Sequence, residues 1–424
     1  MIGLALLAVY VGIFVVSYLV VRYFVHQSIS GFTARKTVTF GDESAVTPNR
    51  IASVVSVVTI FLIWGSFTGS AWVPGFLHAP APFVGETSFT YTLEAPDGQR
   101  DDATVFVHVL PFGEKPEKFT VPPGDGFAKD DAVAMTASRS VTILFDRNDE
   151  VKRKDGAHVV AIDGNPISPD TVVKTGIGRF ALTDKGAISF QPPTGLQMEP
   201  IWLPPPESVV QRAVEIARDG YRDTTLWGHL GYSLFRVVVG FALGALVGIP
   251  LGYAMGLSNW FRGWFDPIVE FMRPVPPLAL IPLVIIWFGI GETGKIILLF
   301  LASLWIMAIA ARSGVSGVNI SKVHAAYSLG ASKAQIMRHV IMPNSLPEIF
   351  TGARVAMGVC WGTVVAAELV AATEGAGMMI MVASKFQLTD IVLMGIILIG
   401  VIGFGIDILM RKAEKILVPW KGRS

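Results

Sequence analysis

Charged residues are scarce in this chain and cysteine is almost absent. Only 16% of its 424 residues are charged, whereas a soluble protein carries about 25%. The deficit argues against a soluble protein and indicates a membrane protein. The single cysteine, Cys360, lies in an apolar run and excludes an intrachain disulfide, so we interpret it as a small core side chain. The net charge of +1 offers no footprint for nucleic acid.

Long apolar runs take the place of those missing charges. A helix that spans a bilayer needs roughly 20 mostly apolar residues. About seven runs qualify: Ile2–Val21, Ile51–Val73, Val237–Leu257, Pro274–Gly291, Ile296–Ala311, Val355–Ala372 and Ile391–Leu409. The first is either a signal peptide or a retained span. Its start lacks a basic region and Arg22 follows it, which favours a retained span.

The distribution of basic residues predicts how the chain lies in the membrane. Lysine and arginine gather in alternate connections, at 22–50, just after the third run, at 312–338 and at 411–423. The positive-inside rule assigns these segments to the cytoplasm. The C-terminus is then cytoplasmic, and the segment 80–226 lies on the outer side.

The segment 78–200 differs from the rest of the chain. Between Pro80 and Leu203 there are 18 acidic and 12 basic residues, against 15 and 22 elsewhere. Stretches such as "SFTYTLEAPDG", "ATVFVHVLPFGE" and "RFALTDKGAISF" place β-branched and aromatic residues between turn residues, which predicts strands. His108 and His158 stand alone and have no metal-ligand spacing. The sequence predicts a β-rich extracytoplasmic insert without a metal site.

The stretch "GIGETGK", from Gly289 to Lys295, resembles a phosphate-binding loop. That motif needs a Ser or Thr next, whose hydroxyl binds Mg²⁺, but the next residue is Ile296. Its flanks are apolar runs, and the orientation places it outside. We therefore predict a glycine-rich turn between two long apolar helices that binds no nucleotide.

Glycines recur at every fourth position of the third apolar run. This spacing puts them on one helix face, where small residues let another helix approach closely. Pro250 lies within the row and is expected to bend the helix. Tight packing in a bundle and a moving contact surface in a transporter both remain open for Gly240, Gly244, Gly248, Gly252 and Gly256.

The basic segment "KVHAAYSLGASKAQIMRHVIMPNSLPEIF" predicts two short helices. The first covers about Val323–Leu329, and Gly330 suits a helix end where φ is positive. Ser332 and Gln335 form a capping box for the second helix. Pro343 and Pro347 then restrict the entry to the sixth run.

This segment resembles the EAA loop of ABC importer permeases, whose pattern is E-A-A, three residues, Gly, nine residues, I-x-L-P. The matching positions are Ala325, Ala326, Gly330, Val340, Met342 and Pro343, while His324 stands where the family has Glu. The resemblance implies that the first short helix docks on a cytoplasmic ATPase. The coupling residues so implied are His324, Ala325, Ala326, Leu329, Gly330 and Pro343.

Neighbouring stretches such as "SLFRVVVGFALGALVGIPLG" and "TGARVAMGVCWGTVVAAEL" resemble the nitrate/sulfonate/taurine/bicarbonate permeases. That family implies a six-helix core paired as a dimer, two ATP-binding subunits, an extracytoplasmic binding protein and an inner-membrane location. ATP and Mg would be bound by the partner subunits, so that this chain holds no cofactor or metal and is not an enzyme. The resemblance implies a small oxyanion as substrate, with taurine or another sulfonate first and nitrate or bicarbonate behind.

We therefore expect an all-α polytopic membrane protein with an inserted β-rich domain. Its predicted parts are an extra N-terminal helix at 1–25, a cytoplasmic loop at 26–50, the first core helix at 51–77, the insert at 78–200, and the permease core at 201–424 with its coupling loop at 313–349. Two rivals remain: an ion-coupled secondary transporter, and a membrane-anchored sensor that uses the insert as its ligand module.

Four charges lie within otherwise apolar helices, where such groups usually have partners. Arg236 and Glu368 are both near the predicted outer side, so we expect an ion pair; the alternative is an outer gate or a contact for an anion. Arg354 and Asp407, near the inner ends of their helices, are expected to pair likewise.

Overall fold

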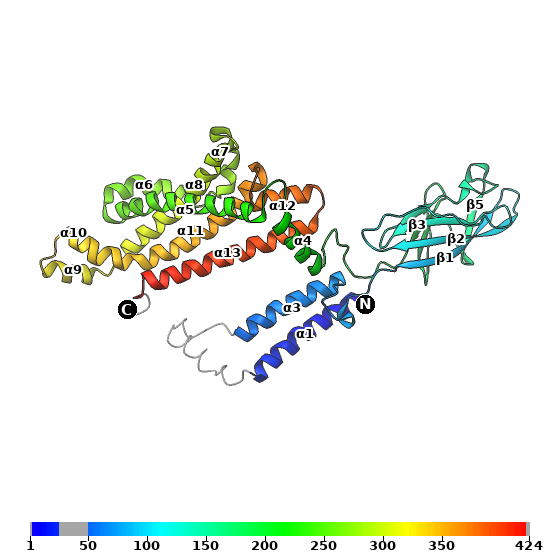
Figure 1. The fold of residues 1–424 in the computed structure, drawn as a ribbon, viewed down its shortest axis with the longest axis horizontal. Helices are drawn as coiled ribbons and strands as arrows, with labels where there is room; N and C mark the ends of the chain where they lie inside the picture. Colours follow the sequence, from blue (N-terminus) through cyan, green and yellow to red (C-terminus); the bar gives the residue numbers. More distant parts are fainter. Residues whose placement is uncertain (1, 25–49, 421–424) are drawn as a thin grey trace. The chain divides into compact units, whose positions relative to one another are not determined.

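The structure is a computed structural model that describes residues 2–24 and 50–420 (Figure 1). It divides into two compact units, Met1–Glu207 and Ser208–Ser424, and each is described by itself. All of the predicted loop 26–50 except Arg50 lies outside the described residues.

The first unit begins with two apolar helices, α1 (Ile2–Phe24) and α3 (Arg50–Thr68). The second of these ends five residues before the expected limit at Val73. Gly69 follows it with a φ of +65°, a left-handed conformation that ends helices and that glycine adopts without strain. Ser70 N then donates to Gly65 O at 2.9 Å, and a 3-10 turn covers Gly75–Leu77.

Two β-sheets make up most of the remaining first unit. One has the order β3-β2-β1-β5-β6 and the other β4-β9-β8-β7, with every pair antiparallel except β2 and β3. The strands are β1 (Gly85–Glu94), β2 (Arg100–Leu110), β3 (Asp131–Thr136), β4 (Val141–Ile143), β5 (His158–Ile162), β6 (Asn165–Pro166), β7 (Val172–Thr175), β8 (Gly178–Leu182) and β9 (Ile188–Gln191). The prediction of a β-rich region is confirmed, and its side of the membrane stays a prediction.

The two sheets pack face to face around one aromatic core. Alternation in β1 buries Phe89, Tyr91 and Leu93, as expected for a strand with one covered face. The Phe89 ring lies 4.6 Å from the ring of Phe180 on the other sheet and 5.5 Å from that of Phe190. The core is drawn from residues 83–190 alone, so this β-sandwich has what a domain needs to fold by itself.

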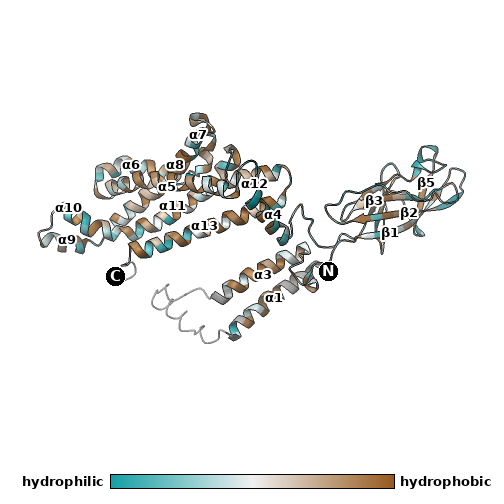
Figure 2. Cartoon of the chain, viewed as in Figure 1, coloured by the Kyte–Doolittle hydropathy of each residue, from teal (hydrophilic) through white to brown (hydrophobic). Residues whose placement is uncertain are grey.

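The second unit is helical, and Figure 2 shows that hydrophobic residues run along its long helices. Four described helices are long and apolar enough to span a membrane (α5, α8, α10–α11 and α13), and a bent pair at 259–288 would make a fifth. The expected total of about seven spans stays unconfirmed. The helices are α4 (Pro206–Asp219), α5 (Leu226–Leu257), α6 (Asn259–Met272), α7 (Ile281–Phe288), α8 (Glu292–Ser316), α9 (Ile320–Ser328), α10 (Lys333–Ile336), α11 (Met342–Ala371), α12 (Ala376–Lys385) and α13 (Thr389–Leu417).

The predicted span Pro274–Gly291 is helical only over 277–288, which is too short to cross a membrane without α6. The helix before it, α6, ends at Met272, and the chain turns by 91° before the 3-10 turn at 277–280 and the short α7. Prolines at 274, 276 and 277 explain the break, because each lacks an N–H and disfavours helical backbone in the residue before it.

Two other helix boundaries differ from those predicted. "GIGETGK" is a turn only over its first three residues, since Glu292 already begins α8. The second short helix of the predicted coupling loop does not end before the sixth span. It passes from α10 through a π-helical stretch, Met337–Ile341, directly into α11. Pro343 is in the first turn of α11 and Pro347 lies inside that helix. Pro347 has no N–H to donate to the carbonyl of Pro343 four residues earlier, and that carbonyl accepts from Trp420 Nε1 at 3.1 Å instead.

The row of five glycines on α5 packs directly against α8, and we call this contact the glycine seam. A Cβ at Gly244 would lie 1.9 Å from Ser303 Oγ, and one at Gly252 would lie 2.4 Å from the backbone oxygen of Ala308. Both distances are far inside van der Waals contact. The predicted close approach is therefore found, and any larger residue in the row would push the helices apart.

Acidic side chains gather at one place in the β-sandwich. Burial, with a further contribution from the charge of Asp149, raises the pKa of Asp131 to about 7. Burial likewise raises the pKa of Asp149 to about 6, although Lys129 N donates to that carboxylate at 2.7 Å. An unfolded aspartate has a pKa near ~3.9. The folded sandwich therefore binds more protons than the unfolded chain between about pH 4 and 7.

Because the folded state holds the extra protons, stability falls as pH rises through this window. We predict that the isolated segment 80–200 melts at a higher temperature at pH 5 than at pH 8. Asp131→Asn should flatten the slope, whereas Asp184→Asn, at an exposed turn, should leave it unchanged. Circular dichroism melts across this range measure the effect. A melting temperature that rises from pH 5 to 8 in the unsubstituted segment would contradict the assignment.

Candidate functional site

A buried ion network lies where α5, α8 and α11 meet. Arg236 is on α5, Glu292 is in the first turn of α8, and Glu368 is near the C-terminal end of α11. Arg236 Nη1 donates to Glu368 Oε1 at 2.6 Å, and both side chains are 0% exposed. Arg236 Nε and Nη2 also donate to the two oxygens of Glu292 at 2.6 and 2.7 Å. The guanidinium is thus held in a fork between two carboxylates.

The local sequence explains why these groups meet. His229, Ser233 and Arg236 are spaced by four and three residues on α5, so they share one helix face. Ser233 Oγ donates to Glu368 Oε1 at 2.8 Å. The backbone amides of Gly375, Ala376 and Gly377 donate to His229 Nδ1, Ser233 Oγ and Glu368 Oε2 at 3.0–3.1 Å. The network therefore also fixes the start of α12.

The expected partner of Arg236 is present, but sequence reasoning missed half of the network. Lys295 is buried and donates to Glu292 Oε1 at 2.9 Å. Two cations and two anions balance each other, so Arg236 is held as an ion pair rather than presented to an anion. Glu292 and Lys295 lie in "GIGETGK", and their i,i+3 spacing at the start of an apolar helix was the available signal.

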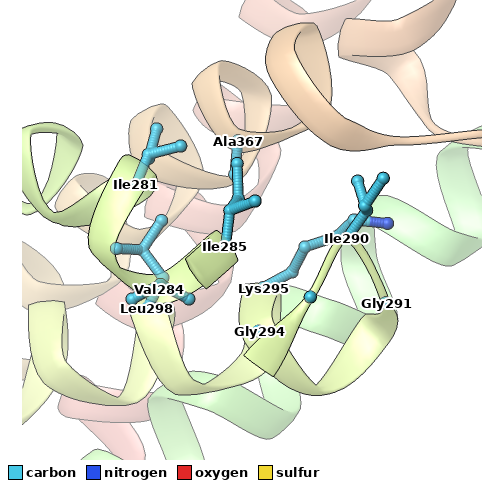
Figure 3. Close-up of a pocket in the computed structure, with 10 residues that line it drawn as sticks. Ile281, Val284, Ile285, Ile290, Gly291, Gly294, Lys295, Leu298 and Ala367 are labelled. Carbon is cyan, nitrogen blue, oxygen red and sulfur yellow. The ribbon is translucent and has the colours of Figure 1, made fainter. Parts of the chain in front are cut away.

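A small apolar hollow between α7 and α8 borders this network (Figure 3). Its volume is about 20 Å³, which is room for about one water molecule. Lys295 supplies the only charged side chain of the ten lining residues. The hollow is too small for a sulfonate.

All the predicted coupling residues except Pro343 lie in, or directly after, the exposed helix α9. Asn319 caps it, its side chain accepting from Ser321 N at 2.9 Å. Gly330 has a φ of +82°, and the Ser332–Gln335 capping box is formed as expected. The helix begins three residues before the predicted start at Val323. His324 and Ala325 are exposed, Ala326 is partly buried, and Leu329 is 88% exposed.

One side-chain hydrogen bond ties α9 to the membrane helix that follows, from Lys322 Nζ to Asn344 Oδ1 at 2.8 Å. Asn344 is itself fixed within that helix, because its Nδ2 donates to Val340 O at 2.6 Å. Pro343, the last predicted coupling residue, accepts a hydrogen bond from Trp420 Nε1 at 3.1 Å. An open hollow beside α9 and α10 is lined by Ala326, Leu329, Gly330, Ala331, Gln335, Ile336, His339 and Val340.

A second group of charges joins α11 to α13. Arg354 Nε lies 3.4 Å from Asp407 Oδ1, as expected, and Arg354 Nη1 lies 3.6 Å from Glu414 Oε2. Arg411 lies 2.6 Å from the other oxygen of Asp407. Among the residues that the structure describes, no three His, Cys, Asp or Glu side chains are grouped so that they would hold a metal.

The helical unit matches a known family of transport proteins. Residues 244–416 match the family described as binding-protein-dependent transport system inner membrane component. The taurine transport system permease protein TauC of Escherichia coli is 49% identical over 226 residues, which are 53% of this chain and 82% of that protein.

Two further relatives share this region. A putative aliphatic sulfonates transport permease, SsuC of Escherichia coli, is 38% identical over 51% of this chain and 81% of its own length. The nitrate import permease NrtB of Synechocystis is 31% identical over 51% of this chain and 81% of its own length.

A multi-helix inner-membrane permease is the class of protein that these helices and matches define. The chain belongs to the ABC importer permeases of the nitrate/sulfonate/taurine family. In that family ATPase activity lies in partner subunits, and a substrate-binding protein takes part in transport. The family sets aside the secondary transporter and the sensor as alternatives.

The two carboxylates on Arg236 provide a matched test of the network. Glu368→Ala leaves a fully buried guanidinium short of its charge partner, which costs about 3–5 kcal/mol. Glu292→Ala also takes a partner from buried cations, Arg236 and Lys295, but this carboxylate is 50% exposed. Water can replace it there, so the loss of stability should be smaller than for Glu368→Ala. Thermal melts of the two purified variants in detergent measure the difference. Equal losses would show that burial does not set the strength of these pairs.

Proposed function

We propose that this chain is the membrane subunit of an importer for taurine or another small sulfonate. The observation that carries this proposal is the 49% identity to TauC over 82% of that protein's length. SsuC and NrtB, whose names also refer to small oxyanions, support the same chemical class. Taurine is therefore the first substrate to test, with other sulfonates and nitrate behind it.

Uptake into proteoliposomes tests the substrate directly. The complex of this chain with its ATP-binding subunits, supplied with the binding protein and ATP, should accumulate labelled taurine. Unlabelled alkanesulfonate should compete more strongly than nitrate, because it shares the sulfonate group. Transport of nitrate or bicarbonate without transport of any sulfonate would contradict the proposed substrate and place the chain in another branch of the family.

The further assembly follows the family. In this proposal two copies of the chain form the pore, two ATP-binding subunits hold ATP and Mg, and this chain binds no cofactor of its own. The basic segments 312–338 and 411–423 lie in the cytoplasm, and the β-sandwich lies in the periplasm beside the binding protein.

Thiol labelling tests this orientation. Lys154→Cys is at an exposed site of the sandwich and Lys412→Cys is at an exposed site near the C-terminus, while the native Cys360 is buried. In cells with a permeabilised outer membrane, a membrane-impermeant maleimide should label the first variant, and it should label the second only after lysis. The reverse pattern would invert the topology.

Transmission of ATP-driven motion is assigned to α9 and the helix that follows it. A docked α9 has two mechanical links to the bundle: the chain through Gly330 into the continuous α10–α11 helix, and the hydrogen bond from Lys322 to Asn344. Rigid-body movement of α9 would therefore act on α11, which carries Glu368 at its far end. The ATP-bound and ATP-free partner must contact α9 differently for this coupling to operate.

The positive φ of Gly330 gives a sharp test of this coupling. Gly330→Val adds a β-branched side chain where φ is +82°, a cost of roughly 1–2 kcal/mol that the chain relieves by rotating α9. Gly330→Asn is the matched control, because asparagine tolerates this conformation. Valine should abolish uptake and weaken copurification of the ATPase, while asparagine retains both.

Two substitutions on α9 complete the series. Ala326→Asp should block docking by bulk and charge, whereas His324→Ala should be mild. Membrane abundance, ATPase recovery and uptake are measured together for all four variants. Full uptake in both Gly330→Val and Ala326→Asp would remove the coupling role from this segment.

A further inference from the structure

Helix α6 has three distinct faces. Val269 packs into the bundle in one cluster with Met255 of α5 and Ala308 of α8. A second face carries large exposed aromatic and apolar side chains: Trp260, Trp264, Ile268 and Phe271. The third face, which we call the polar arc, carries Asn259, Arg262, Gly263, Asp266, Glu270 and Arg273.

The spacing of the polar arc follows the helical repeat. Arg262, Asp266, Glu270 and Arg273 are separated by four, four and three residues, so they form one stripe. With a rise of about 1.5 Å per residue, the stripe runs for roughly 16 Å along the helix. Arg262, Asp266 and Glu270 line one open hollow along α6, and Arg273 follows at the end of the helix.

The polar arc has a surplus of positive charge. Arg312 of α8, which is 15% exposed, pairs with Asp266 and reaches Glu270 at 2.9 Å, so it neutralises much of both carboxylates from the bundle side. Arg262 and Arg273 lie 3.8 Å from the same carboxylates and are 55% and 66% exposed. Three arginines thus share two carboxylates, and the two exposed ones hold their partners only loosely.

The arrangement matters because α6 and the segment 277–288, which are bent by 91° relative to each other, are together long and apolar enough to make one broken membrane span. Charged side chains in a membrane protein face the bundle interior or water, rather than lipid. The aromatic face suits contact with lipid, and the packed face is already covered. Water or a polar solute is left as the neighbour of the polar arc.

We propose that the polar arc of α6 borders the aqueous path of the transported solute, and that Arg262 and Arg273 contact its oxyanion group in passing. Each of the two guanidiniums already has a carboxylate 3.8 Å away. The oxyanion can replace this carboxylate briefly, and the carboxylate then displaces the oxyanion again, so the oxyanion does not stay bound. Arg312 keeps the carboxylates neutralised while this happens. The inference rests on the proposed function as a sulfonate importer. A phospholipid headgroup offers the same phosphate-type oxygens, and the experiments separate the two.

Cysteines introduced one at a time at two adjacent positions test whether the polar arc is accessible to water. Gly263→Cys is on the polar arc, where an added Cβ meets nothing within 4 Å, and Trp264→Cys is on the aromatic face. In inside-out vesicles containing the full complex, an impermeant maleimide should label Gly263→Cys at least roughly tenfold faster than Trp264→Cys, because a thiol reacts as the thiolate that water supports. Taurine and binding protein enclosed in the vesicle lumen, with ATP outside, should slow that labelling. Equal rates, or no effect of taurine, would overturn the proposal and favour headgroup contact.

Transport measurements test the two arginines. Arg262→Gln and Arg273→Gln should each lower taurine uptake per ATP by roughly tenfold, the size expected for one charge-assisted hydrogen bond, while ATPase stimulation by the binding protein persists. Arg218→Gln, at an exposed position of α4, is the control. Equal loss of ATPase activity and uptake would indicate a lipid or folding role and sink the inference. If the unsubstituted complex takes up no sulfonate, the proposed function fails, and the labelling contrast still decides whether the arc is wet.

Discussion

The close approach of α5 and α8 is the constraint on which the helical unit depends. Five glycines remove every side chain from one face of α5, so the two backbones meet along the glycine seam. Helix–helix attraction in a bilayer comes from van der Waals contact and polar bonds, since lipid is as apolar as the side chains. The glycines expose the backbone of α5, so α8 can approach closely and van der Waals contact is large.

The glycine seam also determines which charged side chains come into contact at its two ends. Arg236 is one helical turn before Gly240, and the close packing there brings it within reach of Glu292 at the start of α8. At the opposite end Gly256 contacts Val315, near the position where Arg312 reaches across to α6. One packing interface thus aligns a buried, balanced ion network at one end and an exposed, partly balanced group at the other.

Local features of the fold were predictable from the sequence because their causes are local. The positive φ of Gly330 and the Ser332–Gln335 capping box involve neighbours within three residues, and the glycine row follows from helical periodicity. The break between Met272 and Pro277 was not predicted, although it contains two prolines, because the apolar run continues through it. The passage of α10 into α11 was not predicted either, because Pro343 and Pro347 indicate a helix end, whereas the helix continues through both.

The sequence by itself determined that the chain is a membrane protein with a β-rich segment, and the EAA-like spacing indicated its family. The pairing of Arg236 with Glu368 was also within reach, since buried charges need partners and few were present. Only the tertiary structure brought Glu292 and Lys295 to the same network and Arg312 to the carboxylates of α6. Arg236 and Glu292 are 56 positions apart in the chain, and Arg312 and Glu270 are 42 positions apart. Their geometry depends on how far apart the helix backbones lie, and no local periodicity encodes that distance.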